Sequence, residues 1–187
     1  MTDRLSTLYL GVLLGWLLFS GFLWVARPDQ AALAGLVLGL GLVMGLRRHM
    51  VIGGAMAVLE PIGVVLPLLA LRHMALAACP DLAPWLGQWP SWELAAIVLL
   101  YPLFLAASMG VWRAEPYRLG FHPMPVAVMV LILCLYALAT GNLSLALIVV
   151  AGQVQWVLRR GSSNWFDHVL HVFVLPVAAI ELVSRLW

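Results

Sequence analysis

Residues 7–26 read TLYLGVLLGWLLFSGFLWVA and residues 123–140 read PMPVAVMVLILCLYALAT, and neither stretch contains a charged side chain. A helix of about twenty apolar residues crosses the hydrocarbon core of a bilayer. Similar stretches fill most of the chain, whose residues are 64% hydrophobic and only 10% charged. A soluble domain carries roughly a quarter charged residues, so this composition indicates a protein that folds in lipid.

The expected fold is an all-α, polytopic bundle of about seven transmembrane helices that form one domain over residues 1–187. Helices are expected because irregular backbone cannot face lipid. The spans are predicted at about 7–26, 30–46, 50–71, 93–112, 123–140, 143–158 and 165–186.

The arginines predict the orientation of the bundle. All ten basic residues are arginines, and seven of them lie near the N-terminus or in alternate connections: Arg4, Arg47, Arg48, Arg113, Arg118, Arg159 and Arg160. The positive-inside rule therefore predicts a cytoplasmic N-terminus and an external C-terminus, in a multi-pass protein of the cell inner membrane. The absence of lysine excludes a Schiff-base pigment protein. A net charge of +2 without a basic patch argues against nucleic acid as a partner.

The first two expected spans carry pairs of glycines four residues apart, which let helix backbones approach closely in lipid. These glycines are Gly11 with Gly15, Gly35 with Gly39, and Gly41 with Gly45. We expect the two helices to pack tightly against each other, or against another subunit or a second copy of the chain. Membrane lipids are the other expected partners.

The last expected span opens with the richest group of chemically active side chains, Asp167, His168 and His171. Residues three or four apart share one face of a helix. Imidazole and carboxylate at this spacing can bind a divalent metal, or a histidine can act as a general base that the aspartate orients. The structural alternative is that Asp167 caps the helix and the histidines lie at the lipid headgroups.

Two further histidines, His49 and His122, begin the third and fifth expected spans at the same membrane face. If the odd-numbered spans are neighbours, these imidazoles converge with His168, His171 and Asp167. Such a set suffices for a zinc or iron site with an open position.

Glu60 falls near the middle of the third expected span and is followed by Pro61. A carboxyl group there is protonated or paired. It can relay protons, coordinate a cation, act as a general acid, or form a structural hydrogen bond.

A short echo links the third and seventh expected spans. Residues 64–67 read VVLP and residues 173–176 read FVLP. This weakly suggests an internal repeat, and the two prolines are expected to kink their helices.

A bundle of this kind, with Asp167-His168-Val169-Leu170-His171-Val172 opening its last helix, resembles the superfamily of alkaline ceramidases and adiponectin-type receptors. In that superfamily a zinc-binding His-x-x-x-His opens the last helix near the cytoplasm. The resemblance implies zinc-dependent lipid hydrolysis. In this chain Asp167 stands where the first histidine would be, and the second span lacks a Ser-x-x-x-His.

Three hypotheses follow. The first is a metal-dependent intramembrane enzyme that acts on a lipid or other apolar substrate, with Asp167, His168, His171 and Glu60 as catalytic candidates. The second is a transporter of protons, metal ions or a small solute that uses Glu60. The third is a non-catalytic subunit of a membrane complex, docked through the glycine-rich helices. Ligation of haem by paired histidines is a further option.

Overall fold

The computed structural model describes residues 2–46, 48–59 and 63–185, and these residues form helices and connections without any strand. The expected all-helical class is therefore confirmed. In chain order the helices are α1 (Thr2–Phe22), α2 (Pro28–Leu46), α3 (Met50–Leu59), α4 (Val65–Ala78), the 3₁₀ turn η1 (Pro80–Leu82), α5 (Ala83–Leu86), α6 (Ser91–Ser108), the 3₁₀ turn η2 (Pro116–Phe121), α7 (Pro123–Thr140), α8 (Leu143–Val157), α9 (Phe166–Val169) and α10 (Val174–Ser184).

Four of these helices are long and apolar enough to cross a membrane: α1 from Arg4 onward, α2, α6 and α7. Three shorter apolar helices, α4, α8 and α10, accompany them. Only 11% of the apolar window of α7 is buried inside the protein, and side chains such as Leu131 and Leu138 are exposed. Apolar faces of this extent belong against lipid rather than water, so the helices indicate a membrane protein.

Two expected spans are interrupted helices. The expected span 50–71 consists of α3 and α4, and α4 continues to Ala78, beyond the predicted end of the span. The expected span 165–186 consists of α9 and α10, with Leu170 in extended backbone (φ −121°, ψ 144°) after α9. Residues 60–62, which include Glu60, lie outside the described part of the chain.

The prolines of the VVLP and FVLP echo explain where the second helix of each pair begins. Pro67 and Pro176 occupy the third position of α4 and α10, after N-cap residues of nearly the same backbone conformation (Val64 φ −70°, ψ −19°; Phe173 φ −69°, ψ −9°). Backbone N–H groups in the first turn of a helix have no partner within the helix, so proline is tolerated there. The expectation that these prolines kink continuous helices is therefore wrong.

Glycines hold α1 and α2 close together. A methyl group added at Gly39 would lie 2.3 Å from the backbone nitrogen of Gly15, and one added at Gly35 would lie 2.5 Å from the Gly15 carbonyl oxygen. Gly11 packs on Leu40 in the same contact. In contrast, Gly41 and Gly45 have no atom within 4 Å of such a group. The first two glycine pairs therefore form the α1–α2 contact, and the third pair is open.

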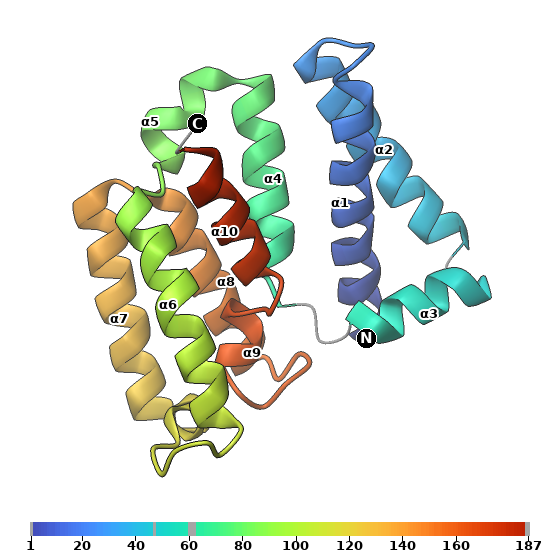
Figure 1. The fold of residues 1–187 in the computed structure, drawn as a ribbon. Coiled ribbons are helices and arrows are strands. Elements are labelled where there is room, and N and C mark those ends of the chain that lie inside the picture. Colours follow the sequence, from blue (N-terminus) through green and yellow to red (C-terminus); the bar gives the residue numbers. More distant parts are fainter. Residues whose placement is uncertain (1, 47, 60–62, 186–187) are drawn as a thin grey trace.

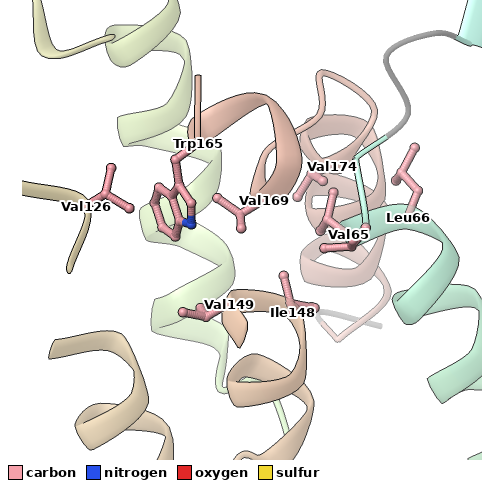
Figure 2. Packing of buried hydrophobic residues seen from close by; sticks show 9 residues of the cluster. Val65, Leu66, Val126, Ile148, Val149, Trp165, Val169 and Val174 are labelled. Carbon is pink, nitrogen blue, oxygen red and sulfur yellow. The ribbon is translucent and has the colours of Figure 1, made fainter. Parts of the chain in front are cut away.

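Helix α4 joins two parts of the molecule, because it packs against α1 and α2 on one side and against α8 on the other. Figure 1 shows α1 and α2 beside each other and α6, α7, α8 and α10 grouped on the other side of α4. The larger apolar core lies in this second group, where the fully buried Trp165 meets valines from neighbouring helices, as Figure 2 shows. Its buried members are Val64, Val65, Leu66, Val126, Ile148, Val149, Trp165, Val169 and Val174.

Replacement of Gly39 by alanine tests the α1–α2 contact. The added methyl group has no room against the Gly15 backbone, so we expect Gly39→Ala to lower the free energy of unfolding by about 1–3 kcal/mol. Titration with sodium dodecyl sulfate, followed by circular dichroism, measures this loss.

The matched control is Gly41→Ala in the same helix, where the added methyl group meets open space. This variant should unfold at the same detergent concentration as the wild type or at a higher one. Equal stability of the two variants would contradict the close α1–α2 packing.

Candidate functional site

The elements that carry the predicted site residues lie at one end of the molecule. Figure 1 shows the α2–α3, α6–α7 and α8–α9 connections at the end where the N-terminus lies, away from the C-terminus. His49 and His122 flank the first two of these connections, and His168 lies in α9. Among the arginines that predict the cytoplasmic side, Arg47 lies outside the described residues and Arg4 belongs to the first turn of α1. The other five belong to the same three connections: Arg48, Arg113, Arg118, Arg159 and Arg160.

The two interrupted helices meet where they are broken. The backbone N–H of Val64, which caps α4, donates to the carbonyl oxygen of His168 in α9 at 2.8 Å. A methyl group added at Gly63 would lie 2.4 Å from that oxygen and 2.6 Å from the carbonyl oxygen of Asp167. The chain that enters α4 therefore lies directly against α9, at a distance that only glycine permits.

His168 is a buried, fully hydrogen-bonded side chain with only 3% of its surface exposed. Its Nε2 lies 3.0 Å from the Ser162 carbonyl oxygen, and its Nδ1 lies 3.1 Å from Oε1 of the Gln155 side chain. A carbonyl oxygen only accepts, so Nε2 carries the proton. A neutral ring then satisfies both contacts if the amide nitrogen of Gln155 faces Nδ1, an assignment that rests on the hydrogen-bond network.

Asp167 points toward a different set of partners. The Tyr117 hydroxyl donates to both of its carboxylate oxygens, at 2.9 Å and 2.8 Å, and the Ser162 hydroxyl donates to one of them at 2.5 Å. Burial, the hydrogen bond to Asp167 and the charge of that carboxylate raise the pKa of Tyr117 from 10.0 to about 12. Asp167 therefore fastens the η2 turn to α9, and hydroxyl groups occupy both of its oxygens.

Asn164 completes this junction, although the sequence analysis did not single it out. Its side-chain nitrogen donates to the Tyr117 carbonyl oxygen at 2.7 Å, and its side-chain oxygen accepts from the backbone N–H of Phe166 at 2.9 Å. The backbone N–H of Trp165 donates to the Gly120 carbonyl oxygen at 3.0 Å. The sequence does contain an indication of this role, because the polar residues Ser162 and Asn164 precede an apolar helix at positions typical of caps.

The other three histidines of the predicted metal set lie outside this junction. The Nδ1 atom of His171 accepts from the backbone N–H of Phe173 at 3.2 Å, just before α10. His122 is the exposed N-cap residue of α7, and His49 is exposed beside the start of α3. Across residues 2–46, 48–59 and 63–185, no three His, Cys, Asp or Glu side chains are grouped so that they could hold a metal ion. The predicted metal set therefore gains no support from the described residues.

A cavity of about 510 Å³ lies between α1 and α8 and extends to the beginning of α4. Most of its wall is apolar, and Gln155, the hydrogen-bond partner of His168, forms part of it. The lining residues are Arg4, Leu5, Tyr9, Val64, Ala151, Val154, Gln155, Leu158 and Arg160. Sequence reasoning used the two arginines only to orient the bundle and did not anticipate that they share a cavity.

Comparison with protein-family models, with curated proteins and with solved structures finds no match to this chain. The resemblance to alkaline ceramidases therefore gains no support, and the function is argued from the site alone.

The Tyr117–Asp167 contact predicts how stability depends on pH. Because folding raises the pKa of Tyr117 from 10.0 to about 12, the neutral phenol is favoured in the folded protein. Its stabilising contribution is complete below pH 10 and is lost as the pH rises toward 12. The free energy of unfolding of the wild type should therefore exceed that of Tyr117→Phe below pH 10, and the difference should vanish by about pH 12. A difference that stays constant over that range would show that folding does not raise the pKa of Tyr117.

Proposed function

We propose that this chain is a multi-pass protein of the cell inner membrane that binds a lipid or other apolar molecule in the cavity between α1 and α8. The cavity carries the proposal. Its volume of about 510 Å³ lies in the range of sites for small molecules, roughly 300–1,000 Å³. Its walls are supplied largely by aliphatic side chains such as Leu5, Val154 and Leu158, which suit an acyl chain better than a polar solute.

The polar residues beside the cavity favour binding and orientation of the bound molecule. Gln155 lines the cavity, and its side-chain amide is within hydrogen-bond distance of the His168 ring. Both ring nitrogens of His168 and both carboxylate oxygens of Asp167 have partners within the chain. A general base must lie within hydrogen-bond reach of its substrate, and neither His168 nor Asp167 lines the cavity. The proposal therefore assigns Gln155 to contact with the ligand and His168 to the positioning of Gln155. The metal-dependent hydrolase hypothesis shares this substrate class but adds a metal that no described cluster supports.

One observation favours transport as a second candidate function. The interrupted helices α3–α4 and α9–α10 meet through the Val64–His168 hydrogen bond. Pairs of discontinuous helices form the substrate sites of many secondary transporters. Glu60 belongs to the segment between α3 and α4 and would supply a titratable group there. This candidate predicts proton flux into proteoliposomes that Glu60→Gln abolishes.

Membership of a larger complex is the third candidate, and it would use the open face of α2. Gly41 and Gly45 are exposed and could receive a helix from another subunit or a second copy. Gly11, Gly15, Gly35 and Gly39 already pack within the chain.

A pair of valines on α8 tests lipid binding. Val154 lines the cavity, whereas Val157 does not, and both are exposed (50% and 61%). Phenylalanine at position 154 fills part of the cavity. We therefore expect Val154→Phe to release a bound dioleoyl phospholipid and Val157→Phe to retain it, as counted by native mass spectrometry of the detergent-purified protein.

Equal lipid retention by the two variants would contradict the proposal. The transport candidate instead predicts flux that responds to Glu60→Gln and is indifferent to whether Val154→Phe still binds lipid.

A further inference from the structure

Two arginines, Arg4 and Arg160, line the cavity, and none of the described lining residues is acidic. Among the described residues the ion pairs lie elsewhere: Arg27 with Asp29, Arg118 with Glu115, and Arg185 with Glu181. The carboxylate nearest in sequence to Arg160, that of Asp167, accepts hydrogen bonds from Tyr117 and Ser162, and the described ion pairs do not join it to Arg160. The cavity therefore presents two positive charges without a described carboxylate to neutralise them.

The turn after α8 fixes the backbone of Arg160. Its N–H donates to the Gln155 carbonyl oxygen at 2.9 Å, and the N–H of Arg159 donates to the Trp156 carbonyl oxygen at 3.0 Å. Arg159 adopts the left-handed conformation (φ 51°) that glycine usually supplies at the end of a helix. The backbone of Arg160 is therefore fixed beside the cavity by a hydrogen-bonded turn.

The charges and the walls together specify the chemical class of the ligand. Guanidinium groups bind phosphate oxygens through paired, charge-assisted hydrogen bonds. A small soluble anion would need the arginines but not the aliphatic wall formed by Leu5, Val154 and Leu158. Only an amphiphile uses both features.

The location favours a lipid of the cytoplasmic leaflet. The cavity lies at the arginine-rich end of the bundle, and the cytoplasmic leaflet is the one that carries anionic lipids. Basic pockets between membrane helices on this side recognise such headgroups.

We propose that the cavity binds an anionic phospholipid, with its phosphate between Arg4 and Arg160 and its acyl chain along α1 and α8. This inference rests on the proposed lipid-binding function and adds the identity of the headgroup. Tyr9 and Gln155 also line the cavity, and they supply the hydroxyl and amide groups that meet the glycerol and ester oxygens.

Lipid titration of the full-length protein in mild detergent tests the proposal, with bound lipid counted by native mass spectrometry. The probes are dioleoyl-phosphatidylglycerol, which is anionic, and dioleoyl-phosphatidylcholine, which is zwitterionic. We expect at least about tenfold tighter binding of phosphatidylglycerol, and about a tenfold loss of that affinity in Arg4→Gln and in Arg160→Gln. Binding of phosphatidylcholine, whose choline offsets the charge of its phosphate, should weaken less than that of phosphatidylglycerol in both variants.

Arg48→Gln is the matched control, because Arg48 is an exposed arginine at the same end of the bundle but does not line the cavity. It should bind phosphatidylglycerol like the wild type. Arg4→Lys and Arg160→Lys keep the charge but lose the paired hydrogen bonds, so their affinity for phosphatidylglycerol should lie between that of the wild type and that of the glutamine variants. Added sodium chloride should weaken binding of phosphatidylglycerol to the wild type more than binding of phosphatidylcholine, a readout that needs no variant.

The outcomes separate this inference from the proposed function. If both lipids bind equally well and Val154→Phe still releases both, the anionic specificity is wrong while the lipid site stands. If Val154→Phe releases neither lipid, both proposals are wrong. Inorganic phosphate that competes as strongly as phosphatidylglycerol would identify a site for a soluble anion and overturn the assignment to a lipid.

Discussion

The hydrogen bond from the Val64 N–H to the His168 carbonyl oxygen, 2.8 Å long, is the contact on which the rest of the structure depends. In lipid, apolar side chains gain little by meeting each other instead of acyl chains, so close packing and polar contacts must hold helices together. Gly63 allows the chain before α4 to approach the α9 backbone. Helix α4 then contacts α8 on one side and the α1–α2 pair on the other, and the cavity lies where these parts meet.

The same contact explains why the most reactive side chains of the sequence act as connectors. The backbone oxygen of His168 accepts the hydrogen bond from Val64 at the start of α4, and its ring contacts Gln155 and Ser162. Asp167 fastens the η2 turn through Tyr117. Polar groups inside a membrane protein are costly unless they are paired, and here the pairing joins elements that are distant in sequence. What remains open to a ligand is the cavity beside Gln155 and its two arginines.

Local chemistry in the sequence was sufficient to predict the helical class, the long apolar helices and the close approach at Gly15 and Gly39. Composition and glycine spacing act within one helix or between sequence neighbours, so they can be recognised without coordinates. The helix starts just before Pro67 and Pro176 fit the same kind of local rule, although we expected kinks there instead. Proline is better tolerated in a first turn than in a helix interior. Hydropathy alone does not indicate either interruption, because the residues on both sides of each break are equally apolar.

The site itself depended on contacts that no local rule reveals. Arg4 and Arg160 are separated by almost the whole chain, and Asn164 reaches Tyr117 across 47 positions. Amide hydrogen exchange of the wild-type protein, followed residue by residue by nuclear magnetic resonance, tests the central contact most directly. The N–H of Val64 should exchange as slowly as that of Leu69, whose N–H lies inside α4 with a carbonyl oxygen of the same helix four residues before it. Exchange of Val64 much faster than that of Leu69 would mean that α4 is not tied to α9, and the account of the cavity would fail with it.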